Sequence, residues 1–358
     1  MSQNSYRRTA VLMGTFVTIE VSGDRAAQPY IVDTEERVER AFDWFHRIEE
    51  CCSRFDGRSE LMRLTAEIGV SVPVSAILYE AVRFALAVAE ETAGAFDPTV
   101  GVQMERNGFN QDYRTRQAVR TGVAPLGPVS YRDVRLDPGR RAITLLRPLV
   151  LDLGAVAKGL AIDMAARELQ PCGSYAVDAG GDLYLGGVRP DGTPWSVGIR
   201  HPRRDDELID SIRVSNRAVC TSGDYLRKCA GGEGGHHILD PRTGTSVNGV
   251  ASVTVVAPTA MLADAVATAA FVLGPAGGIM LFDRLGVDGL ILSPALERFA
   301  TRGMRSDYDL GRERAAAAVC GGSPVLADAE RPPHRGAGGS DGLGRAGRRP
   351  QAGLAGPP

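Results

Sequence analysis

The stretch His236–Gly274 reads HHILDPRTGTSVNGVASVTVVAPTAMLADAVATAAFVLG, and it joins a histidine, an Asp-Pro turn, a β-branched strand and a helix that opens on an acid. Asp264 and Thr268 stand four residues apart in the chain and therefore share one face of that helix. Two oxygen donors at a helix start can hold a hard cation such as Mg²⁺. His237, which closely precedes Asp240, is a candidate proton acceptor near neutral pH.

This stretch also has a purely structural interpretation. A buried histidine, an aspartate cap and a threonine bonded to its own helix backbone would produce the same residues. Short motifs of this kind often occur without the chemistry that they suggest. The rest of the chain has to decide between the two interpretations.

The composition is that of a soluble globular protein. Hydrophobic residues make up 44% and charged residues 23% of 358 residues, enough for a sizeable core in one large domain or two ordinary ones. The net charge of −2 gives no basis for a nucleic-acid partner or an anionic membrane surface. The six cysteines form no CxxC pair, which favours reduced thiols over disulfides or zinc.

The start of the chain has no apolar run long enough for a signal peptide, and we expect no stretch of the roughly 20 apolar residues that span a bilayer. A cytoplasmic protein without stable membrane insertion is therefore expected.

Helical periodicity is clearest in the first hundred residues. Residues 33–52 predict a helix capped by Asp33 or Thr34. Its buried side is expected to carry Val38, Phe42, Phe45, Ile48 and Cys52. Ser59 is expected to begin a short helix after a Phe-Asp-Gly turn, and Ile77–Thr92 is a second amphipathic helix.

The remaining segments alternate strands and glycine turns. Residues 9–22 predict a strand or hairpin arm, and residues 142–151 predict an edge strand broken by Pro148. The sequence SYAVDAGGDLYLGG, at 174–187, predicts two strands joined by a glycine turn, and 289–293 a last strand. Because hairpins dominate the second half, we expect an α+β fold with mostly antiparallel sheet.

Asp152 and Lys158 mark a strand, a glycine turn and a helix start. Free N–H groups at a helix N-terminus can hold an anion, so this segment is a weak candidate for a phosphate site. From residue 311 to 358 the chain is rich in Gly, Pro, Ala and Arg and has no aromatic residue, which predicts a disordered tail after a domain at 1–310.

Several segments, taken together and in order, resemble the ApbE family of FAD:protein FMN transferases, also called flavin transferases. The resemblance covers roughly residues 10 to 295. It rests on MGT at 13–15, SRFDGRSEL at 53–61, GAFDPTVG at 94–101, LDLGAVAKGLAID at 151–163, VDAGGDLYLGG at 177–187, WSVGIRHP at 195–202, CTSGDY at 220–225, HILDPRTG at 237–244, and SVTVVAP with LADAVATAAFVLG within 252–274.

The resemblance implies a definite reaction. Members of the family use Mg²⁺ to split the pyrophosphate of FAD, join the FMN half to a Thr or Ser hydroxyl of an acceptor protein, and release AMP. Acceptors are typically flavin-carrying subunits or domains of membrane redox complexes. The implied fold is a single globular α+β domain with FAD in a cleft between two lobes.

The resemblance also assigns roles to residues of the first stretch. Asp264 and Thr268 would bind the metal together with the position of Ala155, where only a backbone carbonyl can serve. Some members carry a second acid at the position of Ala267, so its absence here would weaken the metal site. His237 would be the general base for the acceptor hydroxyl.

Further positions correspond to contacts of the flavin nucleotide. Asp152 and Lys158 match positions around FAD, although Glu often stands in place of Lys158. Asp182, Ser222 and Asp240 are assigned to loop geometry near the site. The positions expected to line the flavin or adenine are Met13, Phe55, Asn107, Gly108, Phe109 and Leu239.

Two other functions fit the same residues. With water replacing the acceptor hydroxyl, the site would be an FAD pyrophosphatase that yields FMN and AMP. A carrier or assembly factor that binds FAD without turnover is the other alternative, suggested by Lys158 and by the missing acid at Ala267.

Overall fold

A large antiparallel sheet organises the protein, and its strands come from both ends of the domain. The computed structural model describes residues 5–22, 28–226 and 235–304, with side chains of 28–32 excepted. The sheet has eight strands in the order β1-β2-β6-β7-β10-β13-β14-β15. They are β1 (Ser5–Leu12), β2 (Thr15–Ser22), β6 (Ser174–Ala179), β7 (Asp182–Gly186), β10 (Arg217–Gly223), β13 (Ser252–Ala257), β14 (Asp288–Leu292) and β15 (Arg298–Ala300).

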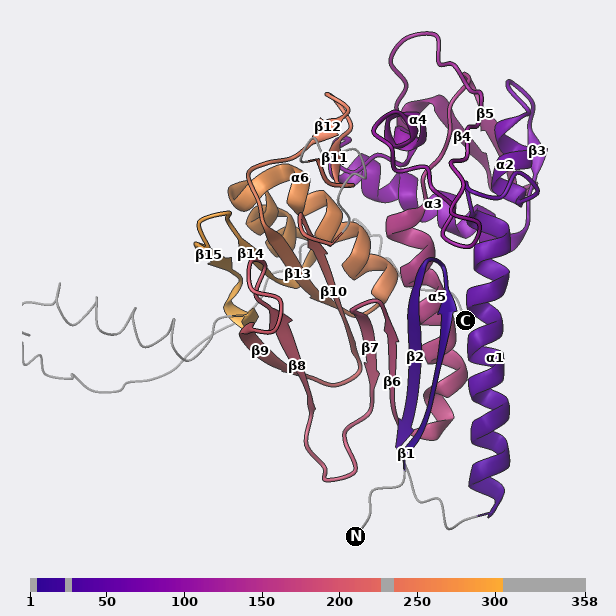
Figure 1. Cartoon of the computed structure of the whole chain (residues 1–358). Coiled ribbons are helices and arrows are strands. Elements are labelled where there is room, and N and C mark those ends of the chain that lie inside the picture. Colours follow the sequence, from indigo (N-terminus) through magenta and orange to yellow (C-terminus); the bar gives the residue numbers. More distant parts are fainter. Residues whose placement is uncertain (1–4, 23–27, 227–234, 305–358) are drawn as a thin grey trace, which may run out of the picture. The chain divides into compact units, whose positions relative to one another are not determined.

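Three long helices cover one face of this sheet: α1 (Gln28–Cys52), α5 (Gly154–Leu169) and α6 (Ala260–Leu285) (Figure 1). Helix α5 packs on β6 and β7, α6 packs on β10 and β13, and α1 lies against α5. The main core lies between these layers, with Phe45, Ile19 and Phe271 among its fully buried side chains. The apolar stripe expected on the first helix is buried as predicted.

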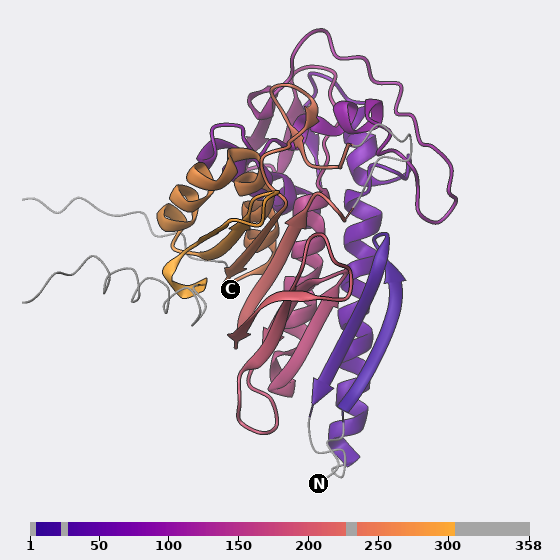
Figure 2. The ribbon, with the colours of Figure 1, turned by 60° about the vertical axis from the view of Figure 1, so that its left-hand side comes forward.

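A hairpin of β8 (Trp195–Arg200) and β9 (Leu208–Val214) carries apolar side chains that pack on the large sheet. Val214 of this hairpin forms a small cluster with Leu185 and Val219 of the sheet. The turned view in Figure 2 shows the helices and the sheet as separate layers. The predicted α+β fold with antiparallel pairing is confirmed, since all named strand pairs of the described residues run antiparallel.

Smaller elements between α1 and α5 form a second group. The three-stranded sheet has the order β3-β5-β4, with β3 (Val72–Pro73), β4 (Val134–Asp137) and β5 (Ala142–Leu145). The helices of this group are α2 (Glu60–Thr65), α3 (Ala76–Glu91) and α4 (Gly101–Arg106), with the 3-10 turns η1 (Pro98–Val100) and η2 (Tyr131–Asp133). The turns η3 (Gln170–Cys172) and η4 (Arg302–Met304) and the two-stranded pair β11 (Leu239–Asp240) and β12 (Thr245–Ser246) complete the fold.

Local signals placed most element boundaries correctly. Ser59 caps α2 by accepting a hydrogen bond from the Met62 N–H at 3.0 Å. The strand expected at 9–22 is a complete hairpin, β1–β2, whose turn is Met13-Gly14. The Cys51, Cys52, Cys172 and Cys220 thiols are free.

Two local predictions were wrong. The first helix begins at Gln28, so Asp33 and Thr34 are not its caps; Asp33 instead accepts from Arg37 Nε at 2.7 Å, one turn later. Strand β5 is not an edge strand, because β3 and β4 pair with its two sides. It ends at Leu145, before Pro148.

Helix α6 is more apolar than we expected of any segment. By length and composition its 26 residues could cross a membrane, and an 18-residue stretch within it has a mean hydropathy of 1.9, which corrects the expectation that no stretch would qualify. The helix packs against the large sheet and α5, and 56% of that 18-residue stretch is buried inside the protein. Burial in the core therefore accounts for its composition. The helix is kinked at Gly274, whose φ is 74°, just before Pro275.

The tail predicted to be disordered, 311–358, lies outside the described residues.

Candidate functional site

The first turns of α5 and α6 are in direct contact. A side chain at Gly159 would place its Cβ 2.5 Å from Met261 Cα, so only glycine permits this approach. One turn later, the Asp163 carboxylate accepts from the Ala260 N–H at 2.7 Å and the Met261 N–H at 3.0 Å. Burial raises the pKa of Asp163 to about 7, against the opposing effect of these two donors. The start of α6 is therefore fixed on α5.

A buried ion cluster lies at this junction. Lys158 Nζ on α5 donates to Asp264 Oδ2 on α6 at 2.8 Å and also pairs with Asp182 Oδ2 at the start of β7. Asp182 is held in turn by the Thr221 N–H of β10, at 3.0 Å from its Oδ1. The Lys158, Asp264 and Asp182 side chains are only 14%, 10% and 9% exposed.

Two hydroxyl groups extend this cluster. Thr268 lies one turn after Asp264 on α6, as predicted, and its Oγ1 is 3.4 Å from Ser222 Oγ on β10. The name cation cluster is used below for Lys158, Asp182, Asp264, Ser222 and Thr268. Ala155 lies one turn before Lys158 on α5. Three distant segments thus bring carboxylate and hydroxyl oxygens together.

The oxygen donors of the cation cluster suit a hard metal ion. The Lys158 ammonium already places one positive charge between the two carboxylates. Within the described ranges no three His, Cys, Asp or Glu side chains gather tightly enough to hold a metal alone. A cation here would need hydroxyl, carbonyl or water oxygens as well, which Mg²⁺ accepts readily.

A second cluster surrounds Arg54, which sequence analysis did not single out. Arg54 Nε donates to Asp152 Oδ2 at 2.6 Å, and Arg54 Nη2 donates to the Phe109 carbonyl. The guanidinium carbon lies 4.2 Å from the centroid of the Phe55 ring. Asp152 Oδ1 accepts from the Gly154 N–H at 2.8 Å, which ties the pair to the start of α5. The name Arg54 cluster is used below for Arg54, Phe55, Phe109 and Asp152.

The two adjacent histidines have different surroundings. His236 is buried, and its Nδ1 accepts from the Ile238 N–H at 3.3 Å, so its Nε2 carries the proton and donates to the Val247 carbonyl at 2.7 Å. Both ring nitrogens of His236 therefore have structural roles. The partly buried His237 ring instead lies edge-to-face with Phe109, with centroids 6.4 Å apart.

Other predicted contacts of the nucleotide join the loops around His237. Asn107 Nδ2 donates to the Gly244 carbonyl at 3.0 Å and thereby links α4 to the loop after β11. Gly108 has a φ of 81°, which lets the chain turn into Phe109. Leu239 is buried in β11, and Asp240 accepts from the Arg242 N–H at 3.0 Å in the following turn.

Met13 stands apart from these contacts. It occupies the β1–β2 turn with a φ of 51°, and it packs on the main core. A Cβ on the adjacent Gly14 would lie 3.5 Å from the Tyr113 ring. The role of Met13 in lining the flavin stays a prediction.

Comparison with known proteins decides the family. Residues 13–291 match the model of the ApbE family. The chain belongs to this family. It is 30% identical over 275 residues to the FAD:protein FMN transferase of Haemophilus influenzae, covering 73% of this chain and 79% of that protein. The protein of the same name from Treponema pallidum is 32% identical over 317 residues, covering 81% and 84%.

Solved ApbE structures have the same fold. The ApbE protein of Thermotoga maritima matches with a TM-score of 0.72 and 33% identity, over 84% of this chain and 97% of that chain. The flavin transferase ApbE from Vibrio cholerae matches with a TM-score of 0.71 and 25% identity, over 84% and 98%.

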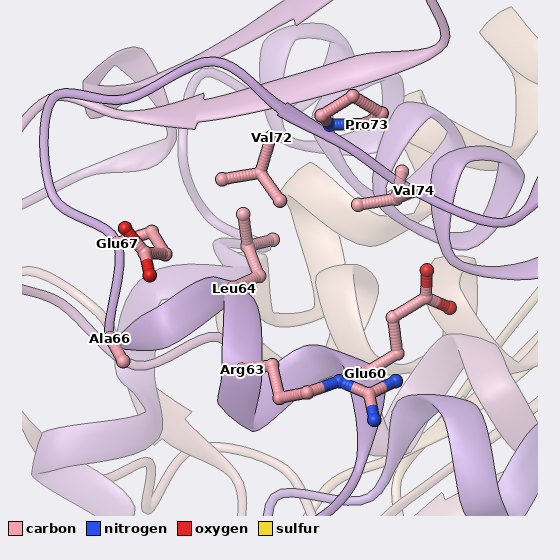
Figure 3. A pocket seen from close by; sticks show the side chains of 8 residues that line it. All are labelled: Glu60, Arg63, Leu64, Ala66, Glu67, Val72, Pro73 and Val74. Carbon is pink, nitrogen blue, oxygen red and sulfur yellow. The ribbon is translucent and has the colours of Figure 1, made fainter.

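A cavity of about 420 Å³ lies between α2 and β3 (Figure 3). It is lined by Glu60, Arg63, Leu64, Ala66, Glu67, Val72, Pro73 and Val74. Glu60 accepts from Ser75 N and Ser75 Oγ at 2.6 Å each, so this carboxylate already serves the start of α3. None of the lining residues belongs to either cluster described above.

The ApbE motifs contained more than the residues first selected. Arg54 and Asp163 both lie within them, and Asp182 and Ser222 prove to be partners of Lys158 and Thr268 rather than loop residues alone. For Asp163, the available signal was a charged residue inside the apolar motif at 151–163, because charged side chains are rarely buried unless paired.

Proposed function

We propose that this protein transfers the FMN half of FAD to a Thr or Ser hydroxyl of an acceptor protein, with Mg²⁺ bound and AMP released. The observation that carries the proposal is that both clusters meet the start of α5: Asp152, two residues before the helix, binds Arg54, and Lys158, within its first two turns, binds the two acids. Relatives of this chain that carry the name FAD:protein FMN transferase support the same reaction.

The cation cluster would hold the metal through Asp264 and Thr268, with the Ala155 carbonyl as a further oxygen. A divalent ion there would supply positive charge to the phosphoryl oxygens of the pyrophosphate. The buried setting strengthens this effect, because charges interact more strongly where water is excluded.

His237 would accept the proton of the acceptor hydroxyl. The hydroxyl oxygen forms a bond to the phosphorus on the FMN side, the bond from that phosphorus to the bridging oxygen breaks, and AMP leaves with the bond's electrons. Phe109 supports the His237 ring from one side, and Arg54 fixes the Phe109 backbone. His236 cannot serve, because both its ring nitrogens are engaged.

The test incubates the protein with FAD, Mg²⁺ and a flavoprotein domain that carries a Thr or Ser flavinylation motif. We expect a fluorescent acceptor band on a denaturing gel, a mass increase equal to FMN minus water on one peptide, and one AMP per label. Free FMN and AMP without a labelled acceptor would replace the proposal with an FAD pyrophosphatase. Bound FAD without metal-dependent AMP release would replace it with an FAD carrier.

A further inference from the structure

The Lys158 ammonium is paired with an acid of the proposed metal site. Its ammonium lies within hydrogen-bonding distance of Asp264 Oδ2 and Asp182 Oδ2, which reach it from α6 and β7. Because both oxygens contact one nitrogen atom, they are close enough to each other to be bridged by one small ion. All three side chains are at most 14% exposed, so little solvent screens them.

Lysine is a rare basic residue in this chain, which otherwise uses arginine. Lys158 and Lys228 are the two lysines among 41 basic residues, and arginine supplies the others. The two side chains differ in kind, because arginine presents a rigid fork that binds carboxylates in pairs, whereas lysine carries a compact charge on a flexible stem. The Lys158 ammonium can therefore leave the carboxylates by rotation of its own side chain, without movement of α5.

We propose that Lys158 acts as an internal cation on Asp264, the acid of the proposed metal site that the ammonium also links to Asp182, so that a metal ion can bind Asp264 only by displacing the ammonium. Lys158 thereby sets a low affinity for the metal and offsets one of the two negative charges of the buried acids when no metal is bound. This inference rests on the metal site of the proposed function, but it concerns binding and not turnover.

The proposal predicts opposite effects for two substitutions of one residue. Lys158→Met removes the competing charge, so the affinity for a divalent ion should rise at least tenfold. Lys158→Arg supplies a guanidinium group that can hydrogen-bond both carboxylates at once, so the affinity for a divalent ion should fall at least tenfold. Arg140→Met, in the exposed turn between β4 and β5, removes the same charge away from the cluster and should leave the affinity unchanged.

The experiment titrates Mn²⁺ into the FAD-free full-length protein and its three variants, with free Mn²⁺ followed by electron paramagnetic resonance. The shift of the thermal unfolding midpoint on adding Mn²⁺ gives a second measurement, and it should be largest in Lys158→Met. Equal or weaker binding by Lys158→Met would overturn the proposal, as would unchanged binding by Lys158→Arg.

The acceptor assay separates this inference from the proposed function. If the wild-type protein labels an acceptor but the Lys158 variants bind Mn²⁺ with unchanged affinity, the transferase proposal stands and the proposal of an internal cation is wrong. The predicted order of affinities without any labelling would retain the internal cation and discard the transferase.

Discussion

Gly159→Ala tests whether the contact between α5 and α6 sets the geometry of the cation cluster. The added methyl carbon would lie 2.5 Å from Met261 Cα, 2.6 Å from Met261 N and 2.7 Å from the Ala260 carbonyl carbon. All three are backbone atoms, so no side chain can rotate away. Since carbon contacts are favourable at about 3.5–4.0 Å, the two helices must separate by about 1 Å.

The expected cost follows from this displacement. Overpacking of a core destabilises a protein by about 1–3 kcal/mol, whereas replacing glycine by alanine within a helix stabilises it by about 0.5–1 kcal/mol. We therefore expect a net loss of about 1–2 kcal/mol in the free energy of unfolding. The same shift moves Asp264 relative to Lys158, and a misplacement of about 1 Å can reduce turnover by about 10²-fold.

Urea unfolding followed by circular dichroism measures the stability, and the acceptor assay measures the turnover. Gly249→Ala is the matched control, because no atom lies within 4 Å of its added Cβ and its φ is not positive. The reasoning is refuted if Gly159→Ala is as stable and as active as the control.

Four further substitutions address the other parts of the site. Burial raises the pKa of Asp163 from 3.8 to about 7, so the protonated side chain stabilises the fold. This contribution is complete below pH 3.8 and is lost as the pH rises through 7. In urea titrations between about pH 4 and 7, the free energy of unfolding of Asp163→Asn should therefore vary less with pH than that of the wild type. Arg54→Met leaves the Asp152 carboxylate without its ion pair and should lower the free energy of unfolding by about 3 kcal/mol. A variant as stable as the wild type would contradict this prediction. Asp264→Ala should abolish metal-dependent AMP release while the circular dichroism spectrum is retained; full activity would remove its metal role. His237→Gly should slow acceptor labelling by about 10²-fold or more while FAD still binds in equilibrium dialysis, and an unchanged rate would exclude it as the base.

The order of motifs and the local capping and turn signals were sufficient for much of the fold. The hairpin at residues 174–187, the Ser59 cap and the helix that carries Asp264 and Thr268 all follow from interactions within a few residues. Such features can be read from the sequence because their partners are neighbours in the chain. The error at β5 arose where this condition fails: β5 is central because β3 and β4 both pair with it, and neither partner can be deduced from β5 itself.

The candidate site shows the same division. The sequence by itself determined the family and the face shared by Asp264 and Thr268. The tertiary structure alone decided that Lys158 meets Asp264 across 106 residues, that Arg54 meets Asp152 across 98, and that His237 and not His236 faces Phe109. The physical reason is that these contacts depend on how the helices dock on the sheet. That docking is set by burial of the whole apolar core, to which no single segment contributes enough to fix its own partners.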